Sequence, residues 1–216
     1  MRILLLDSGK GLIPFIKEIL KIDKRNEYYL FMDYQFFPYG NKSQSQLKKR
    51  LGYLLKKFAK LNIDYLLICC NTLSNIYLSN HFSAPYKIKT ILSLNLKHLK
   101  NKNILVTPSL KNYYQNDERF ISSKIAEYIE HDEIDKLIMT IKEIKSDKKL
   151  ILGCTHYPLA KNLFNHYCPF EIVSYEEEFI LKLPTSSMMS FYGREYERKI
   201  FLKYFPHLII NEYSIT

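Results

Sequence analysis

Short apolar runs alternate along the chain with longer segments whose apolar positions recur at helical spacing. Compact apolar runs bounded by turn residues are typical of buried strands, and a period of about 3.6 residues is typical of helices. We predict strands at residues 2–6, 28–32, 65–69, 87–92, 104–106, 149–152 and 171–173. We predict helices at residues 12–20, 44–60, 121–130, 134–145, 158–166 and 191–205, and one that starts after residue 71.

This alternation favours one fold class. Repeated strand–helix–strand units place successive strands parallel in a sheet whose faces are covered by helices. We therefore expect an α/β protein with mostly parallel sheets. The strand–turn–helix units around Cys70 and Cys154 have similar patterns, which indicates two related halves. No low-complexity linker separates them.

The composition is that of a globular domain. A chain of 216 residues, of which 47% are hydrophobic, can bury one large core or two smaller ones. No run approaches the roughly 20 apolar residues that span a bilayer. The apolar run at residues 3–6 is too short for a signal peptide. Four cysteines are too few for a disulfide scaffold. We expect a cytoplasmic protein with reduced thiols and no membrane partner.

The net charge is +10, with an isoelectric point of about 9.2, which raises the question of nucleic-acid binding. The lysines are spread along the predicted helices, however, and neither an arginine-rich run nor an aromatic RNA-binding motif is present. The abundance of Lys, Asn, Ile and Tyr, with no Trp, indicates compositional drift in an AT-rich genome. Nucleic acid is therefore not the predicted partner, although a positive surface attracts a small anionic substrate.

Two cysteines carry the best indication of chemistry. Cys70 follows the predicted strand at 65–69, and Cys154 follows the one at 149–152 after a single glycine. A thiol between a strand and a helix N-terminus is electrostatically favoured as thiolate. Two such thiols at strand ends suggest paired acid/base groups that face one ligand.

The alternative is a pair of buried structural cysteines, since free cysteine is often buried. The neighbours Asn71, Thr72 and Thr155 favour chemistry, because small hydrogen-bonding groups of this kind hold carboxylates. Cys69 and Cys168 lack such a setting, and we predict that Cys69 belongs to the core.

Cys154-x-His156 and His166-x-Cys168 together could form a metal site by residue type. A helix that begins at Pro158 would carry the second pair about ten ångströms or more away, at roughly 1.5 Å per residue. We therefore predict no metal site, and His156 is interpreted as a second acid/base or hydrogen-bonding group beside the thiol.

Two loops are further candidates. Asp7 ends the first strand and precedes Ser8 and Gly9, where a carboxylate either orients a catalytic group or only caps a turn. The segment lacks both the GxxxxGK[ST] and the GxGxxG pattern, so it does not predict a nucleotide site. The loop at residues 38–43 either closes on a substrate or is a simple turn.

Four segments in order resemble the glutamate racemases of the cofactor-independent aspartate/glutamate racemase family. Residues 7–11 (DSGKG) resemble the family's opening DSGxGG, and residues 38–43 (PYGNKS) resemble its PYGxKS. Residues 70–72 (CNT) resemble its first cysteine motif, and residues 153–159 (GCTHYPL) its second. The form of the second motif favours glutamate over aspartate.

The resemblance implies two α/β domains with the active site in the cleft between them. Here the first domain would comprise residues 1–92 and 186–216, because the family's last helices return to it, and the second would comprise residues 93–185. The family racemises its substrate without a cofactor, and a homodimer is expected. Its usual product, D-glutamate, serves peptidoglycan synthesis and so cell-wall biogenesis and cell shape.

The resemblance also implies residue roles. It makes Cys70 and Cys154 the two bases, one thiolate and one thiol, on opposite faces of Cα, with Asp7, His156 and Glu130 as assisting catalytic groups. The substrate contacts that it implies are Asp7, Ser8, Pro38, Tyr39, Gly40, Asn71, Thr72, Thr155 and His156.

The chain departs from the family at several positions, including Leu12 in place of a second glycine and Cys69 in place of a small alanine. Two alternatives therefore stay open. One is a racemase for aspartate or another amino acid, and the other is a catalytically degenerate homologue that binds a ligand or a nucleic acid. A substrate panel separates the first from a glutamate racemase, and salt-sensitive nucleic-acid binding without racemisation would support the second.

Overall fold

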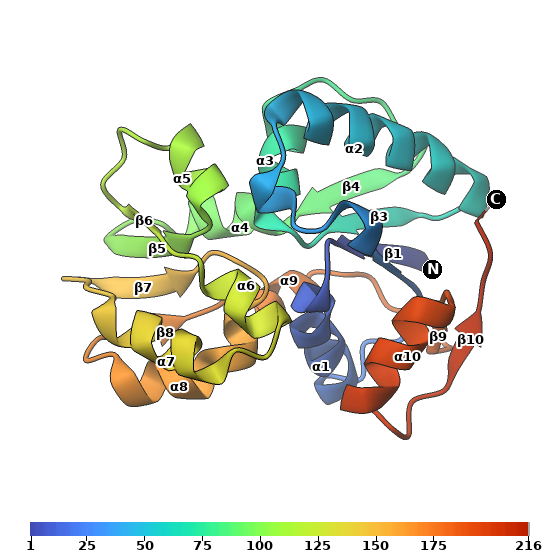
Figure 1. Cartoon of the computed structure of the whole chain (residues 1–216). Helices are drawn as coiled ribbons and strands as arrows, with labels where there is room; N and C mark the ends of the chain where they lie inside the picture. The colour runs from blue at the N-terminus through green and yellow to red at the C-terminus, as the bar shows by residue number, and fades with distance from the viewer. Residues whose placement is uncertain (216) are drawn as a thin grey trace.

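Two parallel β-sheets organise the protein, and the computed structural model describes residues 1–215 (Figure 1). The larger sheet has six strands in the order β10-β9-β2-β1-β3-β4, and the smaller has four in the order β6-β5-β7-β8. Every pairing between these strands is parallel, as the alternating pattern predicted. The strands are β1 (Arg2–Asp7), β2 (Glu27–Met32), β3 (Tyr65–Ile68), β4 (Lys87–Thr90), β5 (Lys102–Val106), β6 (Phe120–Ser122), β7 (Lys149–Leu152), β8 (Ile172–Val173), β9 (Ser190–Gly193) and β10 (Ile210–Glu212).

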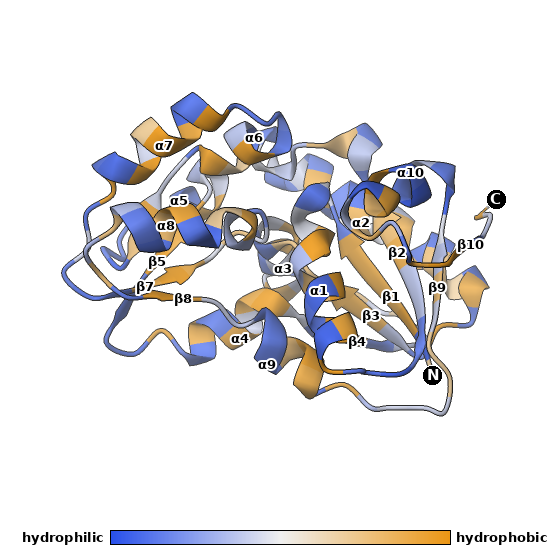
Figure 2. Ribbon diagram, turned by 90° about the horizontal axis from the view of Figure 1, so that it is seen from below, coloured by the Kyte–Doolittle hydropathy of each residue, from blue (hydrophilic) through white to orange (hydrophobic). Residues whose placement is uncertain are grey.

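Helices cover both faces of each sheet, which confirms the predicted α/β class. Figure 2 shows apolar strands inside and helices whose polar faces point outward, the arrangement that buries one stripe of each helix. The helices are α1 (Ile13–Lys21), α2 (Gln44–Phe58), α3 (Asn71–Leu78), α4 (Ile91–Lys97), α5 (Pro108–Tyr113), α6 (Ile125–Glu130), α7 (Ile134–Glu143), α8 (Lys161–Tyr167), α9 (Glu176–Leu181) and α10 (Glu195–Tyr204).

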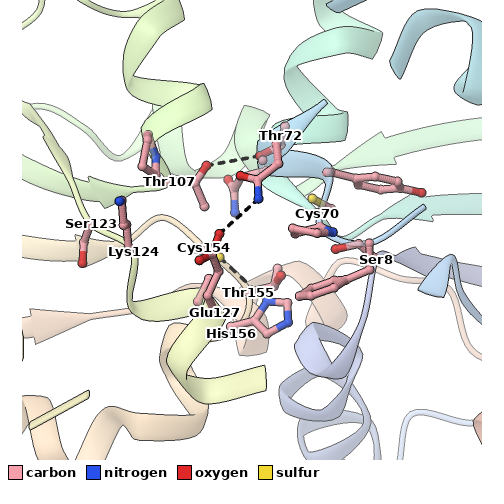
Figure 3. Close-up of a pocket in the computed structure, with 18 of the residues that line it drawn as sticks. Ser8, Cys70, Thr72, Thr107, Ser123, Lys124, Glu127, Cys154, Thr155 and His156 are labelled. Atoms are coloured by element: carbon pink, nitrogen blue, oxygen red, sulfur yellow. Dashed lines mark hydrogen bonds between the residues drawn. The ribbon is translucent and has the colours of Figure 1, made fainter. Parts of the chain in front are cut away.

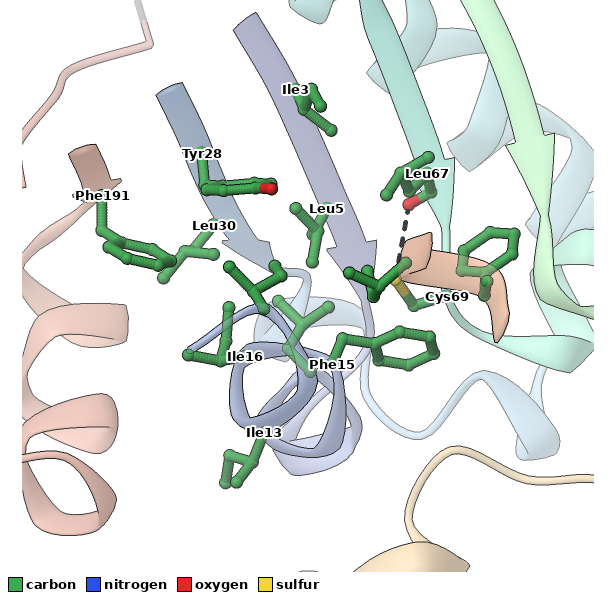
Figure 4. Packing of buried hydrophobic residues seen from close by; sticks show 14 of the residues in the cluster. Ile3, Leu5, Ile13, Phe15, Ile16, Tyr28, Leu30, Leu67, Cys69 and Phe191 are labelled. Atoms are coloured by element: carbon green, nitrogen blue, oxygen red, sulfur yellow. Dashed lines mark hydrogen bonds between the residues drawn. The ribbon is translucent and has the colours of Figure 1, made fainter. Parts of the chain in front are cut away.

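The large sheet has a core on each face. On one face, side chains of β1 and β2 pack with α1, α9 and α10, and Cys69 lies in this cluster as predicted (Figure 4). On the other face, α2 and α3 cover β1 and β3. We call this sheet with its helices the large-sheet half.

The small sheet is built in the same way. The helices α6, α7 and α8 pack on one face, and α4 and α5 on the other. We call this sheet with α5, α6, α7 and α8 the small-sheet half. The strands of the two sheets come from residues 2–90 with 190–212, and from residues 102–173. The domain boundaries at residues 92 and 186 stay a prediction.

The parallel arrangement decides where a site can form. Ser8 follows β1, Cys70 lies just beyond β3, Thr107 follows β5 and Gly153 follows β7, and all four line one cavity. Both sheets therefore present the carboxyl ends of their strands to the same space, where open α/β sheets place their ligands.

Three predicted elements were wrong in part. Residues 121–122 belong to strand β6, and the predicted helix starts only at Ile125. Residues 191–193 belong to β9, and α10 starts at Glu195. Residues 91–92 begin α4 instead of ending β4. These strands are too short for a period to be read, and pairing with their neighbours decides their state.

The pairing of β9 illustrates that tertiary control. The ring of Phe191 stacks on Tyr28 at 5.3 Å between centroids, and Tyr192 stacks on Tyr29 at 4.8 Å. Contacts of this kind between neighbouring strands stabilise a sheet and are invisible in the local pattern. The strand β10 and the helices α4, α5 and α9 were also missed.

The segment from Pro158 also differs from its prediction. Residues Tyr157–Ala160 form a 3₁₀ turn, and the α-helix α8 begins only at Lys161. Within residues 1–215, no helix is both long and apolar enough to cross a membrane.

Candidate active site

The two candidate cysteines lie at the carboxyl ends of central strands from different halves. Cys70 is the N-cap residue of α3 and lies two residues beyond β3, and Cys154 likewise lies two residues beyond β7. Both side chains are buried, each with 8% of the residue exposed, and both line one cavity (Figure 3). The cavity has a volume of about 50 Å³. By the same measure one water needs about 10–15 Å³, so the cavity holds a few waters or one small solute.

Most of the predicted site residues meet here. The cavity is lined by Ser8, Pro38, Tyr39, Gly40, Cys70, Asn71, Thr72, Cys154, Thr155 and His156. Asp7 and Glu130 do not line it, because each is buried directly behind a lining residue. Asp7 is therefore connected to the cavity through Thr155, and Glu130 through His156.

Asp7 holds the two halves together beneath the cavity. Its Oδ2 accepts a hydrogen bond from Thr155 Oγ1 at 2.8 Å, and its Oδ1 accepts one from Gly9 N at 3.1 Å. Burial raises the pKa of Asp7, although the charge of His156 and these two hydrogen bonds oppose the rise. A side chain at Gly11 would place its Cβ 2.7 Å from Asp7 Oδ1, so only glycine fits there.

Cys154 faces an imidazole that is held from behind. Its Sγ lies 3.9 Å from His156 Nδ1, and His156 Nε2 lies 2.8 Å from Glu130 Oε2. Burial alone would lower the pKa of His156, but the hydrogen bonds to Cys154 and Glu130 and the negative charges nearby raise it well above its ordinary value. Burial would raise the pKa of Glu130, but the hydrogen bond and charge of His156 lower it. The pair therefore favours imidazolium and carboxylate, which places a cation beside Cys154.

Cys70 lacks such a partner. Burial raises the pKa of the Cys70 thiol well above its ordinary value, and the negative charge of Asp7 raises it further. The backbone N–H groups of Leu73 and Thr72, at the start of α3, act in the opposite direction. The balance favours the protonated thiol. The two thiols of the cavity therefore have different electrostatic surroundings, an imidazole beside Cys154 and the carboxylate of Asp7 near Cys70.

Small polar groups line the space between the thiols. Asn71 accepts a hydrogen bond from Asn95 Nδ2 at 2.9 Å, which fixes its amide. The hydroxyl oxygens of Thr72 and Thr107 lie 3.3 Å apart across the two halves (Figure 3). Together with Ser8, these groups provide donors of the kind that bind a carboxylate.

The loop that contains Tyr39 is held by a buried ion pair. Tyr39 OH donates to Asp33 Oδ2 at 2.7 Å, and Arg50 Nε donates to the same oxygen at 2.8 Å. The side chain of Asp33 is 1% exposed and that of Arg50 is 19% exposed. A buried carboxylate that is paired twice fixes the path of residues 33–43 along the cavity.

Several lining residues were missed by the sequence reasoning. They include Phe37, Asn41, Thr107, Lys124 and Glu127, of which Asn41 donates to Glu127 Oε1 at 3.3 Å. Phe37 and Asn41 adjoin or lie within the loop that the sequence singled out. The other three lie in turns or helix starts of the small-sheet half, where no local pattern marks them.

The metal hypothesis finds no cluster. Among residues 1–215, no group of three or more His, Cys, Asp and Glu side chains is placed to bind a metal ion. Cys168, the fourth residue of the hypothetical metal site, directs its Sγ to the backbone oxygen of Ile141 on α7, at 4.0 Å.

Comparisons with known proteins agree with this geometry. No family model matches the chain. The glutamate racemase of Fusobacterium nucleatum is 32% identical over 187 residues, which cover 74% of this chain and 71% of that protein. The crystal structure of glutamate racemase from Francisella tularensis in complex with D-glutamate gives a TM-score of 0.77 at 18% identity, covering 100% of this chain and 97% of that one. The Escherichia coli glutamate racemase in complex with L-glutamate and the activator UDP-MurNAc-Ala gives 0.68 at 18% identity, covering 98% and 97%.

The structural neighbours establish the fold, and the relative at 32% identity establishes the family. The curated relatives are amino-acid racemases, a class of isomerase, and the two-sheet α/β fold with two thiols in one cavity agrees with that class. The chain belongs to the glutamate racemase family. The predicted resemblance and enzyme class are thereby confirmed.

Proposed function

We propose that this enzyme interconverts L- and D-glutamate by proton transfer between Cα and two thiols, without a cofactor. The observation that carries the proposal is the convergence of Cys70 and Cys154 on one buried cavity lined by carboxylate-binding groups. Glutamate is proposed as substrate because the relative and the structural neighbours are named for it, and two of those structures contain its enantiomers.

The reaction begins with one thiolate and one thiol. The thiolate takes the proton from Cα, so that a Cα–H bond breaks, an S–H bond forms and the electron pair stays on the substrate. The opposite thiol then gives its proton to the other face of Cα and becomes the thiolate. The two cysteines have exchanged states, and the reverse reaction starts from that arrangement.

The surrounding groups lower the cost of this exchange. The imidazolium of His156 stabilises the thiolate of Cys154, and Glu130 holds the imidazole. Asp7, fixed by Thr155, lies behind the cavity and interacts electrostatically with Cys70. The hydroxyl and amide groups of Ser8, Asn71 and Thr72 bind the substrate carboxylates, so the carbanion-like centre forms in a fixed position.

The experiment is an optical assay of the purified protein with L-glutamate, D-glutamate, L-aspartate and D-aspartate separately. We expect both glutamate solutions to approach the racemic mixture, while both aspartate solutions keep their rotation. Cys70→Ser protein prepared in parallel controls for a contaminating racemase. Faster racemisation of aspartate would overturn the substrate, and no racemisation of either amino acid by folded protein would favour a binding protein.

Two wider roles rest on family membership alone. We propose that the D-glutamate supplies peptidoglycan synthesis and that the enzyme acts as a homodimer. Sedimentation of the purified protein tests the dimer, and D-glutamate dependence of cells depleted of the enzyme tests the role in the cell wall. The cytoplasmic location stays a prediction from the sequence.

A further inference from the structure

Lys10 lies in the opening motif at the position where the family pattern has no set residue. It begins the 3₁₀ turn Lys10–Leu12, between β1 and α1 of the large-sheet half. Its side chain is only 15% exposed, which is low for lysine. Its side chain reaches Glu130 at the end of α6 in the small-sheet half, and Figure 1 shows the end of α6 next to the start of α1. A largely desolvated lysine side chain between two halves of an enzyme needs partners, and its partners indicate a role.

Lys10 contacts Glu130 through both its backbone N–H and its side-chain ammonium. Its backbone N–H donates to Glu130 Oε2 at 3.0 Å, and its Nζ donates to the backbone oxygen of Glu130 at 2.7 Å. The same Nζ lies 3.0 Å from Asp132 Oδ2. The carboxylate of Glu130 also packs against the neighbouring backbone, since a Cβ at Gly9 would lie 2.8 Å from Glu130 Oε2. These contacts therefore fix the position of the Glu130 carboxylate as well as stabilising its negative charge.

One oxygen connects these contacts to the thiol. Glu130 Oε2 accepts from Lys10 N and also contacts His156 Nε2 at 2.8 Å, and the far side of that ring faces Cys154 Sγ at 3.9 Å. We infer that Lys10 is a positioning residue that acts through Glu130 and His156 on the proton transfer at Cys154, across the junction of the two halves. This inference rests on the proposed two-thiol racemisation. Among residues 1–215, no comparable chain of hydrogen bonds leads from Lys10 to Cys70.

The electrostatics give a second readout. Besides Lys10 and His156, the titratable groups that interact with Glu130 are Asp7, Tyr196 and Tyr204. Burial would raise the pKa of Glu130, but His156 lowers it, and the backbone N–H and charge of Lys10 lower it further. Removal of the Lys10 charge must therefore move the acidic limb of the activity profile to higher pH, by about half a pH unit for one partly exposed ion pair.

The test compares Lys10→Met and Lys10→Gln with Lys21→Met. Lys21, at the end of α1, is 60% exposed and pairs with Glu18 and Glu177, so its substitution removes the same charge at a distance from the cavity. We expect kcat/KM of the Lys10 variants to fall about tenfold through loss of positioning, and that of Lys21→Met to stay near the wild-type value. The fall must be equal in both directions because enantiomers have equal free energies. Lys10→Arg, which keeps the charge, should keep the wild-type acidic limb.

Isotope effects with Cα-deuterated glutamate separate the two proton transfers. A slower transfer at Cys154 makes that step more rate-limiting. The isotope effect on kcat/KM must then rise in the direction in which Cys154 removes the deuteron, and fall in the direction in which Cys154 delivers a proton. Equal changes in both directions, or an unshifted acidic limb, would overturn the inference. If Lys10→Met does not fold, Lys10→Gln gives the same comparison.

The two proposals fail differently. Wild-type enzyme that does not racemise glutamate would refute the proposed function. Wild-type enzyme that racemises glutamate, with Lys10 variants indistinguishable from Lys21→Met, would refute only the role of Lys10.

Discussion

The two cysteine units look alike in sequence and differ in their surroundings. Cys70 is an N-cap residue. Burial and the negative charge of Asp7 raise the pKa of its thiol. Cys154 is followed by a turn that brings His156 beside its sulfur, with Glu130 behind the ring. The same strand-to-helix arrangement therefore delivers two thiols, and the groups behind each one give it a different electrostatic setting.

The largest expected effect comes from the thiols themselves. Cys70→Ser and Cys154→Ser should each lower kcat/KM for glutamate by about a thousandfold or more, equally in both directions, because every turnover uses both groups. Initial rates from each enantiomer measure this. Cys168→Ser removes a half-buried thiol on α8's end and should retain activity. Substantial activity in either active-site variant would remove that thiol from the reaction.

Substitution of the imidazole tests the asymmetry. His156→Gln removes the cation beside Cys154 and leaves Cys70 in place, so kcat/KM should fall by about a hundredfold. Because the pKa of His156 is raised above its ordinary value, the wild-type activity should decline only as the pH rises through that raised pKa. The variant should lose this alkaline limb. An alkaline limb that persists unchanged would assign it to another group.

Glu130→Gln tests the imidazolium form of His156 through the pH dependence of the free energy of unfolding. The protonated form of His156 is favoured by folding, so its stabilising contribution is complete below pH 6.5, its ordinary pKa, and is lost as the pH rises through the raised pKa. Without the Glu130 charge the shift shrinks, and each unit removes about 1.4 kcal/mol of this pH-dependent stability. Urea unfolding of the wild-type and Glu130→Gln proteins, below pH 6.5 and above the raised pKa of His156, measures this contribution. Parallel pH profiles would show that Glu130 does not sustain the imidazolium.

The smallest expected effect lies at the loop that lines the cavity. Tyr39→Phe removes one hydrogen bond to Asp33 while the pair between Arg50 and Asp33 remains. A loss of about 1 kcal/mol corresponds to a KM for glutamate raised about fivefold, with kcat almost unchanged. Steady-state kinetics decide this. A fall in kcat with constant KM would instead place the hydroxyl in the proton transfers.

The sequence was informative wherever local order carries the feature. The strands before Cys70 and Cys154 are apolar runs that end in small polar residues, and the structure has them where the pattern predicts. Ser8, directly after β1, and Thr155, three residues beyond β7, likewise line the cavity because they lie at strand ends.

Features made by contacts distant in sequence were not predictable in this way. The strand β9 was predicted as helix because its state depends on pairing with β2. Thr107 and Glu127 reach the cavity only because the two halves pack together, and Lys10 was hidden at a position that the family pattern leaves open. Such contacts follow from tertiary packing and leave no periodic trace.

The most direct test of the two-thiol account is the fate of the Cα hydrogen in D₂O. With wild-type enzyme and L-glutamate at early times, the account predicts deuterium in the D-glutamate product, while the remaining L-glutamate keeps its proton, with the mirror result from D-glutamate. Deuterium that enters substrate and product equally from the start would indicate a single base, and its absence from both in folded, active enzyme would contradict the account.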